Sequence, residues 1–203
     1  IWKQLLLFFF PIALGTFFQQ FYNTIDAIVV GRFVGKNALA AVGGSSGQII
    51  NLIVGFFTGL TSAATVVVSQ FYGSGDRKKV SQCIHTLYGF SLLGSVVISI
   101  LGVALAPTLL EVMNTPAELM AESLLYLRVY FAGTLFIFIY NTGAAVLRAL
   151  GDSKRPMIYL IICCFVNIVL DVVFVVFFKM GVLGAAVATV VALVISSVLV
   201  TRA

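Results

Sequence analysis

Four oxygen-bearing side chains lie in stretches of the sequence that are otherwise strongly apolar. Asn167 and Asp171 are four residues apart, so on a helix their side chains lie on one face. Asp26 and Thr189 lie in two further apolar stretches. Carboxylate, amide and hydroxyl oxygens are hard ligands that suit Na⁺, and an aspartate can instead carry a proton. These residue types predict a binding site for a small cation, either Na⁺ or H⁺.

More polar side chains accompany Asp26 in the apolar run of residues 5–30. Gln19, Tyr22 and Asp26 are at positions i, i+3 and i+7, which places all three on one face of a helix. Gln19 and Tyr22 either contact a substrate or form hydrogen bonds between helices. Asn141, in a later apolar stretch, has the same two alternatives. We predict that Gln19, Tyr22 and Asn141 line a substrate cavity.

The composition indicates that these residues belong to an integral membrane protein. The chain has 203 residues, of which 61% are hydrophobic and 9% are charged, whereas soluble domains carry about 25% charged residues. Its basic residues lie in short loops between apolar stretches, so the net charge of +5 is interpreted as a topology signal and not as nucleic-acid binding. We expect a multi-pass protein of the cell membrane whose surroundings are lipid.

Six apolar stretches predict an all-α membrane protein, a single domain (1–203) that forms a bundle of six transmembrane helices. A helix of about 20 apolar residues crosses a bilayer. The uncharged residues 38–75 contain one strong turn signal, at residues 43–47, which leaves too few residues before it for a separate crossing. We therefore predict one long, glycine-kinked span there. The predicted spans are residues 5–30, 38–72, 80–110, 117–147, 156–178 and 183–203.

The distribution of basic residues predicts which ends of the spans are cytoplasmic, because cytoplasmic segments carry an excess of Lys and Arg. With six spans and the N-terminus inside, Asp26, Asp171 and Thr189 fall in the outer half of the membrane. The basic residues then divide into eight inside (Lys3, Arg77, Lys78, Lys79, Arg148, Lys154, Arg155, Arg202) and three outside (Arg32, Lys36, Lys179).

Arg128 is the one basic residue that this topology leaves inside a span. It gives an alternative explanation of the acids, namely that Asp26 or Asp171 forms an ion pair with it. Two acids cannot both be neutralised by one base, and ionisable residues at membrane depth usually serve a function. The sequence therefore favours the cation site over a purely structural ion pair.

No catalytic motif accompanies these residues. The sequence has no Ser/His/Asp set, no His/Cys cluster with metal-ligand spacing and no nucleotide-binding motif. The loops at residues 72–79 and 148–156 share a Gly-Asp pattern followed by basic residues, which predicts a helix end, a turn and a new helix start. We expect no enzyme and no cofactor besides a coupling ion.

Several stretches together resemble the multidrug and toxic compound extrusion (MATE) family of cation-coupled antiporters, and the resemblance covers almost the whole chain. It implies export of drugs or organic cations in exchange for Na⁺ or H⁺, with Gln19 and Tyr22 beside the substrate cavity. The stretches are residues 10–12, 38–43, 70–76 and 147–152, with Gln19, Tyr22, Asn23, Asp26, Gly31, Asn167, Asp171 and Thr189. The implied cation ligands are Asp26, Asn167, Asp171 and Thr189.

The chain departs from this family in its length. The family has two lobes of six helices, and the chain resembles the N-terminal lobe only. Alternating access between lobes then requires the missing second lobe or a homodimer partner. Two alternatives stay open, a lipid-linked oligosaccharide flippase of the same superfamily and a non-transporting, truncated or scaffold membrane protein.

Overall fold

A computed structural model describes residues 2–202, apart from the side chains of residues 4, 5 and 7. Within these residues the chain is helical and contains no β-strand, so the predicted all-α class is confirmed. The ends of the predicted domain, Ile1 and Ala203, lie outside the described residues. The elements are α1 (Trp2–Phe33), α2 (Lys36–Gly43), α3 (Ser45–Gly73), α4 (Arg77–Val112), α5 (Ala117–Ala149), α6 (Lys154–Asp171), the π-helical segment η1 (Val172–Phe177) and α7 (Val182–Thr201).

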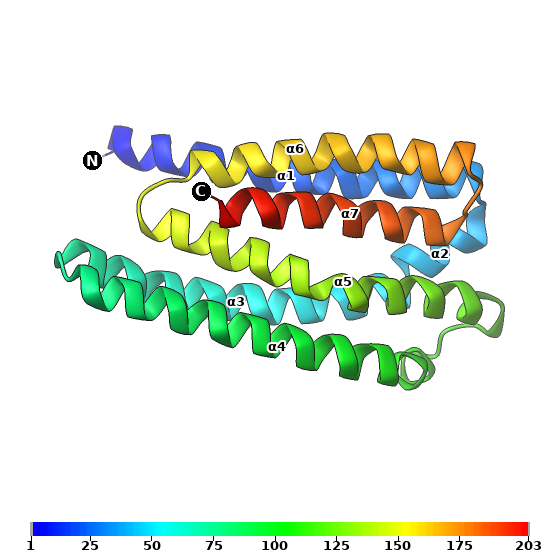
Figure 1. Cartoon of the computed structure of the whole chain (residues 1–203). Helices are drawn as coiled ribbons and strands as arrows, with labels where there is room; N and C mark the ends of the chain where they lie inside the picture. Colours follow the sequence, from blue (N-terminus) through cyan, green and yellow to red (C-terminus); the bar gives the residue numbers. More distant parts are fainter. Residues whose placement is uncertain (1, 203) are drawn as a thin grey trace.

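The long helices lie side by side along their length (Figure 1). α1, α6 and α7 form one group, and α5 connects this group to α3 and α4 because it packs against all three of α3, α4 and α7. Both termini and the α3–α4 and α5–α6 links lie at the left-hand end in Figure 1, and the α4–α5 and α6–α7 links lie at the other end. The segments that are richest in basic residues therefore share one end of the bundle.

The lengths and apolarity of the helices are those of a multi-pass membrane protein. Within the described residues, four helical stretches are long and apolar enough to cross a membrane, and α5 makes a fifth if its two bent halves form one span. α1 is not among them, although it has 32 residues and packs along α6. The division into six spans stays a prediction. The four stretches are Lys36–Gly73, Arg77–Val112, Lys154–Phe177 and Val182–Thr201.

The first of these stretches is broken at Gly44, which separates α2 from α3. A Cβ atom at this position would overlap the carbonyl oxygen of Ala40, so the close approach requires glycine. Ser46, just beyond the break, donates to the carbonyl oxygen of Ser123 on α5 at 3.4 Å. The Ser123 hydroxyl donates in turn to the carbonyl oxygen of Ala41 on α2 at 3.4 Å, and both serines are buried. The break therefore lets the short α2 and the long α3 pack against the same part of α5.

α5 bends by 48° between Ala117–Ala132 and Thr134–Ala149. Two contacts accompany the bend, and one of them is local: the Thr134 hydroxyl donates to the carbonyl oxygen of Phe131 and so competes with the helical hydrogen bonds. Gly133 at the bend packs against α7, where an added Cβ would lie 2.5 Å from Val190 Cγ2. The bend lets α5 follow both of its neighbouring helices.

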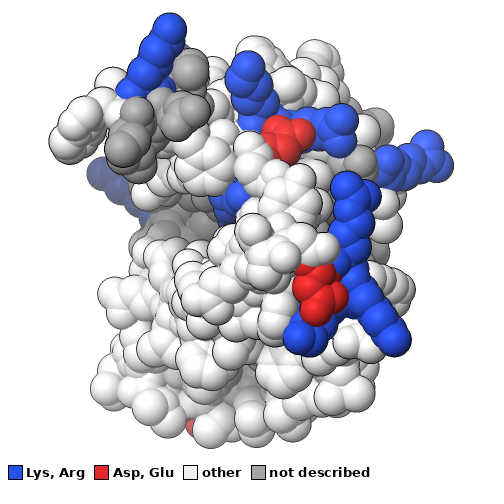
Figure 2. Space-filling model, turned by 90° about the vertical axis from the view of Figure 1, so that its left-hand side faces the viewer, with Lys and Arg blue, Asp and Glu red and all other residues white. Residues whose placement is uncertain are grey.

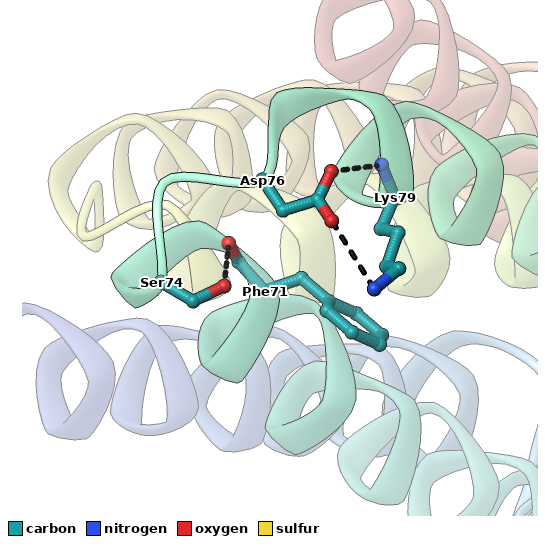
Figure 3. Close-up of polar contacts among 4 residues, drawn as sticks. All are labelled: Phe71, Ser74, Asp76 and Lys79. Atoms are coloured by element: carbon teal, nitrogen blue, oxygen red, sulfur yellow. Dashed lines mark hydrogen bonds and ion pairs between the residues drawn. The ribbon is translucent and has the colours of Figure 1, made fainter.

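The turn between α3 and α4 is closed by local contacts (Figure 3). Gly75 has a φ of 77°, which glycine adopts without strain. The Asp76 carboxylate accepts from the backbone N–H of Lys79 at 3.1 Å and pairs with Lys79 Nζ at 3.2 Å. These contacts, with the backbone hydrogen bond first, hold the pKa of the exposed Asp76 carboxyl below its ordinary value of 3.8. The predicted helix end, turn and helix start are confirmed here.

The turn between α5 and α6 repeats the same arrangement. Gly151 has a φ of 93°, and Asp152 Oδ1 accepts from the backbone N–H groups of Lys154 and Arg155 at 3.0 and 3.1 Å. Asp152 Oδ2 also pairs with Arg155 Nε at 3.2 Å. The Gly-Asp pattern of the sequence therefore predicted both turns correctly.

Candidate cation site

Asp26, Asn167, Asp171 and Thr189 come together inside the bundle from three different helices. Asp26 is on α1, Asn167 and Asp171 are on α6, and Thr189 is on α7. α6 packs against both α1 and α7, which brings these side chains into one cluster. All four are buried, and Asn167 and Asp171 are 0% exposed. We call these four residues the cation cluster.

Thr189 connects the members of the cation cluster. Its hydroxyl oxygen lies 3.4 Å from Asn167 Nδ2 and 3.5 Å from Asp26 Oδ2. It lies closer, at 3.0 Å, to the carbonyl oxygen of Ala185 on its own helix. A threonine hydroxyl has one proton to donate, and distances near 3.5 Å are at the limit of a hydrogen bond. The cluster is therefore only loosely held together by its own hydrogen bonds.

Several oxygen atoms of the cation cluster have no hydrogen-bond partner at all. They are Asp26 Oδ1, Asn167 Oδ1 and both carboxylate oxygens of Asp171. Buried polar atoms normally have partners, and burying an unpaired carboxylate is costly. Bound protons or a bound metal cation would satisfy these oxygens. No three His, Cys, Asp or Glu side chains cluster within residues 2–202, so the mixed oxygen set suits Na⁺ better than a transition metal.

Arg128 does not neutralise the cation cluster. It is exposed on the surface of α5, and no Lys or Arg among residues 2–202 forms an ion pair with Asp26 or Asp171. The alternative explanation by a buried ion pair is therefore wrong. Both acids lie in the apolar interior without a basic partner.

The π-helical segment η1 begins directly after Asp171, and the sequence analysis missed it. π-helical turns inside α-helices are rare and often occur at functional sites, because they change the register of the helix at one point. Here the change of helical register occurs in Val172–Phe177, directly after Asp171. The apolar run Val-Val-Phe-Val-Val-Phe carries no signal for it, since its residue types also suit an α-helix or a strand.

A cavity of about 370 Å³ adjoins the cation cluster, lined by residues of α1, α2, α3, α5 and α7. Asp26 and Thr189 form part of its wall, so the cation cluster and this smaller cavity share two side chains. Tyr22, which is buried, and Gln19 line it too, as does the tyrosine pair Tyr126 and Tyr130, which the sequence analysis did not single out. Aromatic residues four apart on a helix are equally expected in a packed core, so no sequence signal separated this pair.

A larger cavity of about 640 Å³ lies toward the end of the bundle that carries the α5–α6 link. It is lined by residues of α1, α3, α5 and α6, among them Gln19 and Asn141. The Asn141 side-chain amide donates to the carbonyl oxygen of Ile137 at 2.9 Å, which leaves its side-chain oxygen available. The three predicted cavity residues therefore do not share one cavity: Tyr22 lines the smaller one, Asn141 the larger one and Gln19 both.

Comparison with known proteins gives matches along almost the whole chain. The MatE family matches residues 11–173. The "Probable multidrug resistance protein YpnP" of Bacillus subtilis is 36% identical over 188 residues, which are 93% of this chain and 42% of that protein. "Probable multidrug resistance protein YoeA" of the same organism is 31% identical over 195 residues, 94% of this chain and 42% of that protein.

Solved structures agree with these sequence matches. The outward-facing conformation of a multidrug resistance MATE family transporter of the MOP superfamily superposes with a TM-score of 0.87 at 30% identity. The match covers 95% of this chain and 42% of that chain. The chain thus spans less than half the length of the relatives and structures it matches. With a family match over most of its length, a shared helical fold and the same membrane character, the chain belongs to the MatE family of multi-pass membrane transport proteins.

Proposed function

We propose that the chain is the N-terminal lobe of a cation-coupled antiporter that exports drugs or organic cations. The names of its relatives, which describe multidrug resistance proteins, support the substrate class. The observation that carries the proposal is the cation cluster, in which two buried acids have no basic partner and one of them, Asp26, lines a polar cavity. A membrane scaffold would have no need for such a costly arrangement.

The proposed mechanism depends on the charge of the cation cluster. With no cation bound, no positive charge compensates the negative charge of the buried aspartates. Binding of one Na⁺, or protonation of one aspartate, lowers the uncompensated negative charge by one and favours a different packing of α1 against α6 and α7. Because Asp26 and Thr189 also line the smaller cavity, such a movement changes the space that Gln19 and Tyr22 offer to a substrate. Uptake of the cation is thereby tied to release of the substrate.

Alternating access requires a second structural repeat that moves against the first. The chain covers 42% of the length of its relatives YpnP and YoeA, so the remaining part of a protein of that length has room for a second lobe. We therefore assign transport to the complete two-lobe protein, with the cation cluster as the contribution of this lobe.

The test is efflux from proteoliposomes that contain the complete transporter. Ethidium, a fluorescent organic cation, is loaded, and its export is followed under an imposed Na⁺ gradient, an imposed proton gradient or neither. We expect rapid export under one of the two gradients and slow export without a gradient. Export at the same rate in all three conditions would contradict the proposal.

A further inference from the structure

The larger cavity contains a positive charge that no acid in the described chain neutralises. Arg148, in the last turn of α5, lines this cavity and is half-buried. Among residues 2–202 it has no ion pair and no hydrogen bond. The acid nearest in sequence, Asp152, is already occupied by the backbone N–H groups of Lys154 and Arg155 and by the Arg155 guanidinium.

Arg148 has more hydrogen-bond donors than its position in the fold requires. A basic residue in the last turn of a helix interacts favourably with the helix dipole, and a lysine would serve that purpose as well. A guanidinium has five N–H donors in a planar fork that matches the two oxygens of a carboxylate or phosphate. The free donors of Arg148 therefore suit an anion better than they suit a structural role.

A second donor lies close in sequence to Arg148 and lines the same cavity. Ser153, at the start of α6, is 5% exposed, and its hydroxyl makes no capping bond to the helix. Three α3 hydroxyls that line the cavity differ, since Thr58, Thr61 and Thr65 donate to carbonyl oxygens of their own helix. Arg148 and Ser153 therefore offer free donors close together, at the end of the cavity beside the α5–α6 link.

The surroundings of this end favour negative charge. Figure 2 shows the end of the bundle with the α3–α4 and α5–α6 links, where Lys and Arg side chains gather. The two acids of these links, Asp76 and Asp152, are each paired with a basic neighbour. A cluster of one sign of charge raises the local concentration of counter-ions. The larger cavity therefore lies toward a basic end of the bundle, whereas the smaller cavity has the acid Asp26 in its wall.

Part of the wall of the larger cavity is apolar. Phe8, Pro11 and Ile12 of α1 and Met157 and Leu160 of α6 form part of its wall. A free inorganic anion would leave this wall without contacts. A ligand that carries an apolar body behind its anionic group would cover both kinds of surface.

We propose that the larger cavity binds amphipathic organic anions, with Arg148 and Ser153 holding the carboxylate or phosphate group and α1 and α6 contacting the apolar body. This goes beyond the proposed function, which concerns drugs and organic cations, and it does not depend on it, because binding can be measured without transport. The two cavities then differ in charge preference, and Gln19 and Val54, which line both, mark the border between them.

The test is equilibrium binding of a matched pair of fluorescent probes to the complete protein in a neutral detergent. Pyrenebutyrate carries a carboxylate, and pyrenebutanol has the same apolar body with an uncharged hydroxyl. Arg148→Gln should weaken pyrenebutyrate binding by about tenfold or more and leave pyrenebutanol binding within about twofold. Arg148→Lys should give an intermediate loss, since it keeps the charge but not the fork. Ser153→Ala, which removes one neutral donor, should weaken pyrenebutyrate binding by about fivefold.

Arg128→Gln is the matched control, because Arg128 is an exposed arginine of the same helix that lines neither cavity. It should change the binding of neither probe. Equal pyrenebutyrate affinity in the wild type and Arg148→Gln would overturn the proposal, and so would an equal loss of both probes. It would also fail if the second lobe supplied an acid to Arg148, in which case pyrenebutyrate would not bind the wild type better than pyrenebutanol.

The source of the anionic group is decided by repeating the titration in lipid nanodiscs. Phosphatidylcholine discs are compared with discs that also contain phosphatidylglycerol. Loss of pyrenebutyrate binding in the second kind shows that lipid headgroups occupy the site, and retained binding shows that it takes anions from solution. Both results support an anion site, and neither depends on coupled transport.

Discussion

Two aspartates of the chain lie in turns between helices and two lie in the interior of the bundle. The two pairs differ in their burial and in their hydrogen-bond partners. Asp76 and Asp152 lie at helix starts, where each accepts backbone N–H groups and pairs with a basic neighbour. Asp26 and Asp171 are buried, and three of their four carboxylate oxygens have no hydrogen-bond partner.

The difference shows how a structural acid is distinguished from a functional one. The turn aspartates satisfy their oxygens with donors that lie two or three residues away, so their role is complete within a short segment. The buried aspartates depend on helices far apart in the sequence and still leave oxygens open. A buried carboxylate whose oxygens have no hydrogen-bond partner in the fold is available to bind a ligand.

Replacing one buried aspartate and one turn aspartate by asparagine tests this distinction, and the buried position should show the largest loss of export. Asp171→Asn should reduce gradient-driven export by the complete transporter on the order of a hundredfold, because Asp171 is fully buried, both of its carboxylate oxygens lack a hydrogen-bond partner, and the change removes its charge and its proton site. Asp152→Asn should leave export within about twofold, since an asparagine also caps helices well. Both are measured as ethidium efflux from proteoliposomes, after checking that each variant is inserted in comparable amounts. Similar losses in the two variants would remove the distinction.

Asp26→Asn should have a smaller effect than Asp171→Asn. Asp26 keeps one oxygen near the Thr189 hydroxyl and lines the smaller cavity, so it acts at the edge of the cation cluster. We expect an increase of about tenfold in the cation concentration needed for half-maximal export. A loss of gradient-driven export larger than that of Asp171→Asn would show that Asp26 contributes more than Asp171 to the cation site.

Thr189→Ala should distinguish the two possible coupling ions. A hydroxyl oxygen is a ligand for Na⁺ but is not needed when an aspartate is protonated. Export driven by a Na⁺ gradient should weaken about fivefold, and export driven by a proton gradient should stay unchanged. Thr201→Ala, at the end of the same helix and outside the cation cluster, serves as the control. A loss under both gradients would mean that Thr189 holds the helices together instead.

The smallest effect concerns the stability contributed by Asp76. Its folded pKa lies below the ordinary value of 3.8, so its charged form stabilises the fold at higher pH. This contribution is lost as the pH falls through the lowered pKa. The difference in thermal midpoint between wild type and Asp76→Asn should therefore be present at neutral pH and shrink below about pH 3.8. A difference that stays constant across this range would contradict the account of the turn.

The turns could be predicted from the sequence because all their contacts are local. Gly75 and Asp76, like Gly151 and Asp152, sit within one turn of the groups they contact. The class of membrane protein was equally accessible, since it depends on composition and on the lengths of apolar runs.

Other features depend on how distant helices pack, and the sequence did not show them. The bend of α5 arises from Gly133 against Val190 of α7 together with a local bond of Thr134. The π-helical segment after Asp171 has no compositional signal. Residue types and similar depth predicted which acids meet, whereas the exposure of Arg128 could be seen only in the folded chain.

The free guanidinium of Arg148 shows the same limit. In the sequence it is one of several basic residues near a loop, and the topology rule accounts for it fully. The fold places it in the wall of a cavity, where Asp152 is already occupied by other partners. Its role therefore becomes a question only once the neighbouring helices are in place.

We propose that the cation cluster couples cation entry to substrate exit. The most direct measurement is the cation flux that accompanies export, recorded in one proteoliposome preparation with radioactive sodium and a pH-sensitive dye. The account predicts that adding substrate to the wild-type transporter drives movement of either Na⁺ or H⁺ in the opposite direction, and that Asp171→Asn abolishes this movement. A cation flux that still follows the substrate in Asp171→Asn would contradict the account.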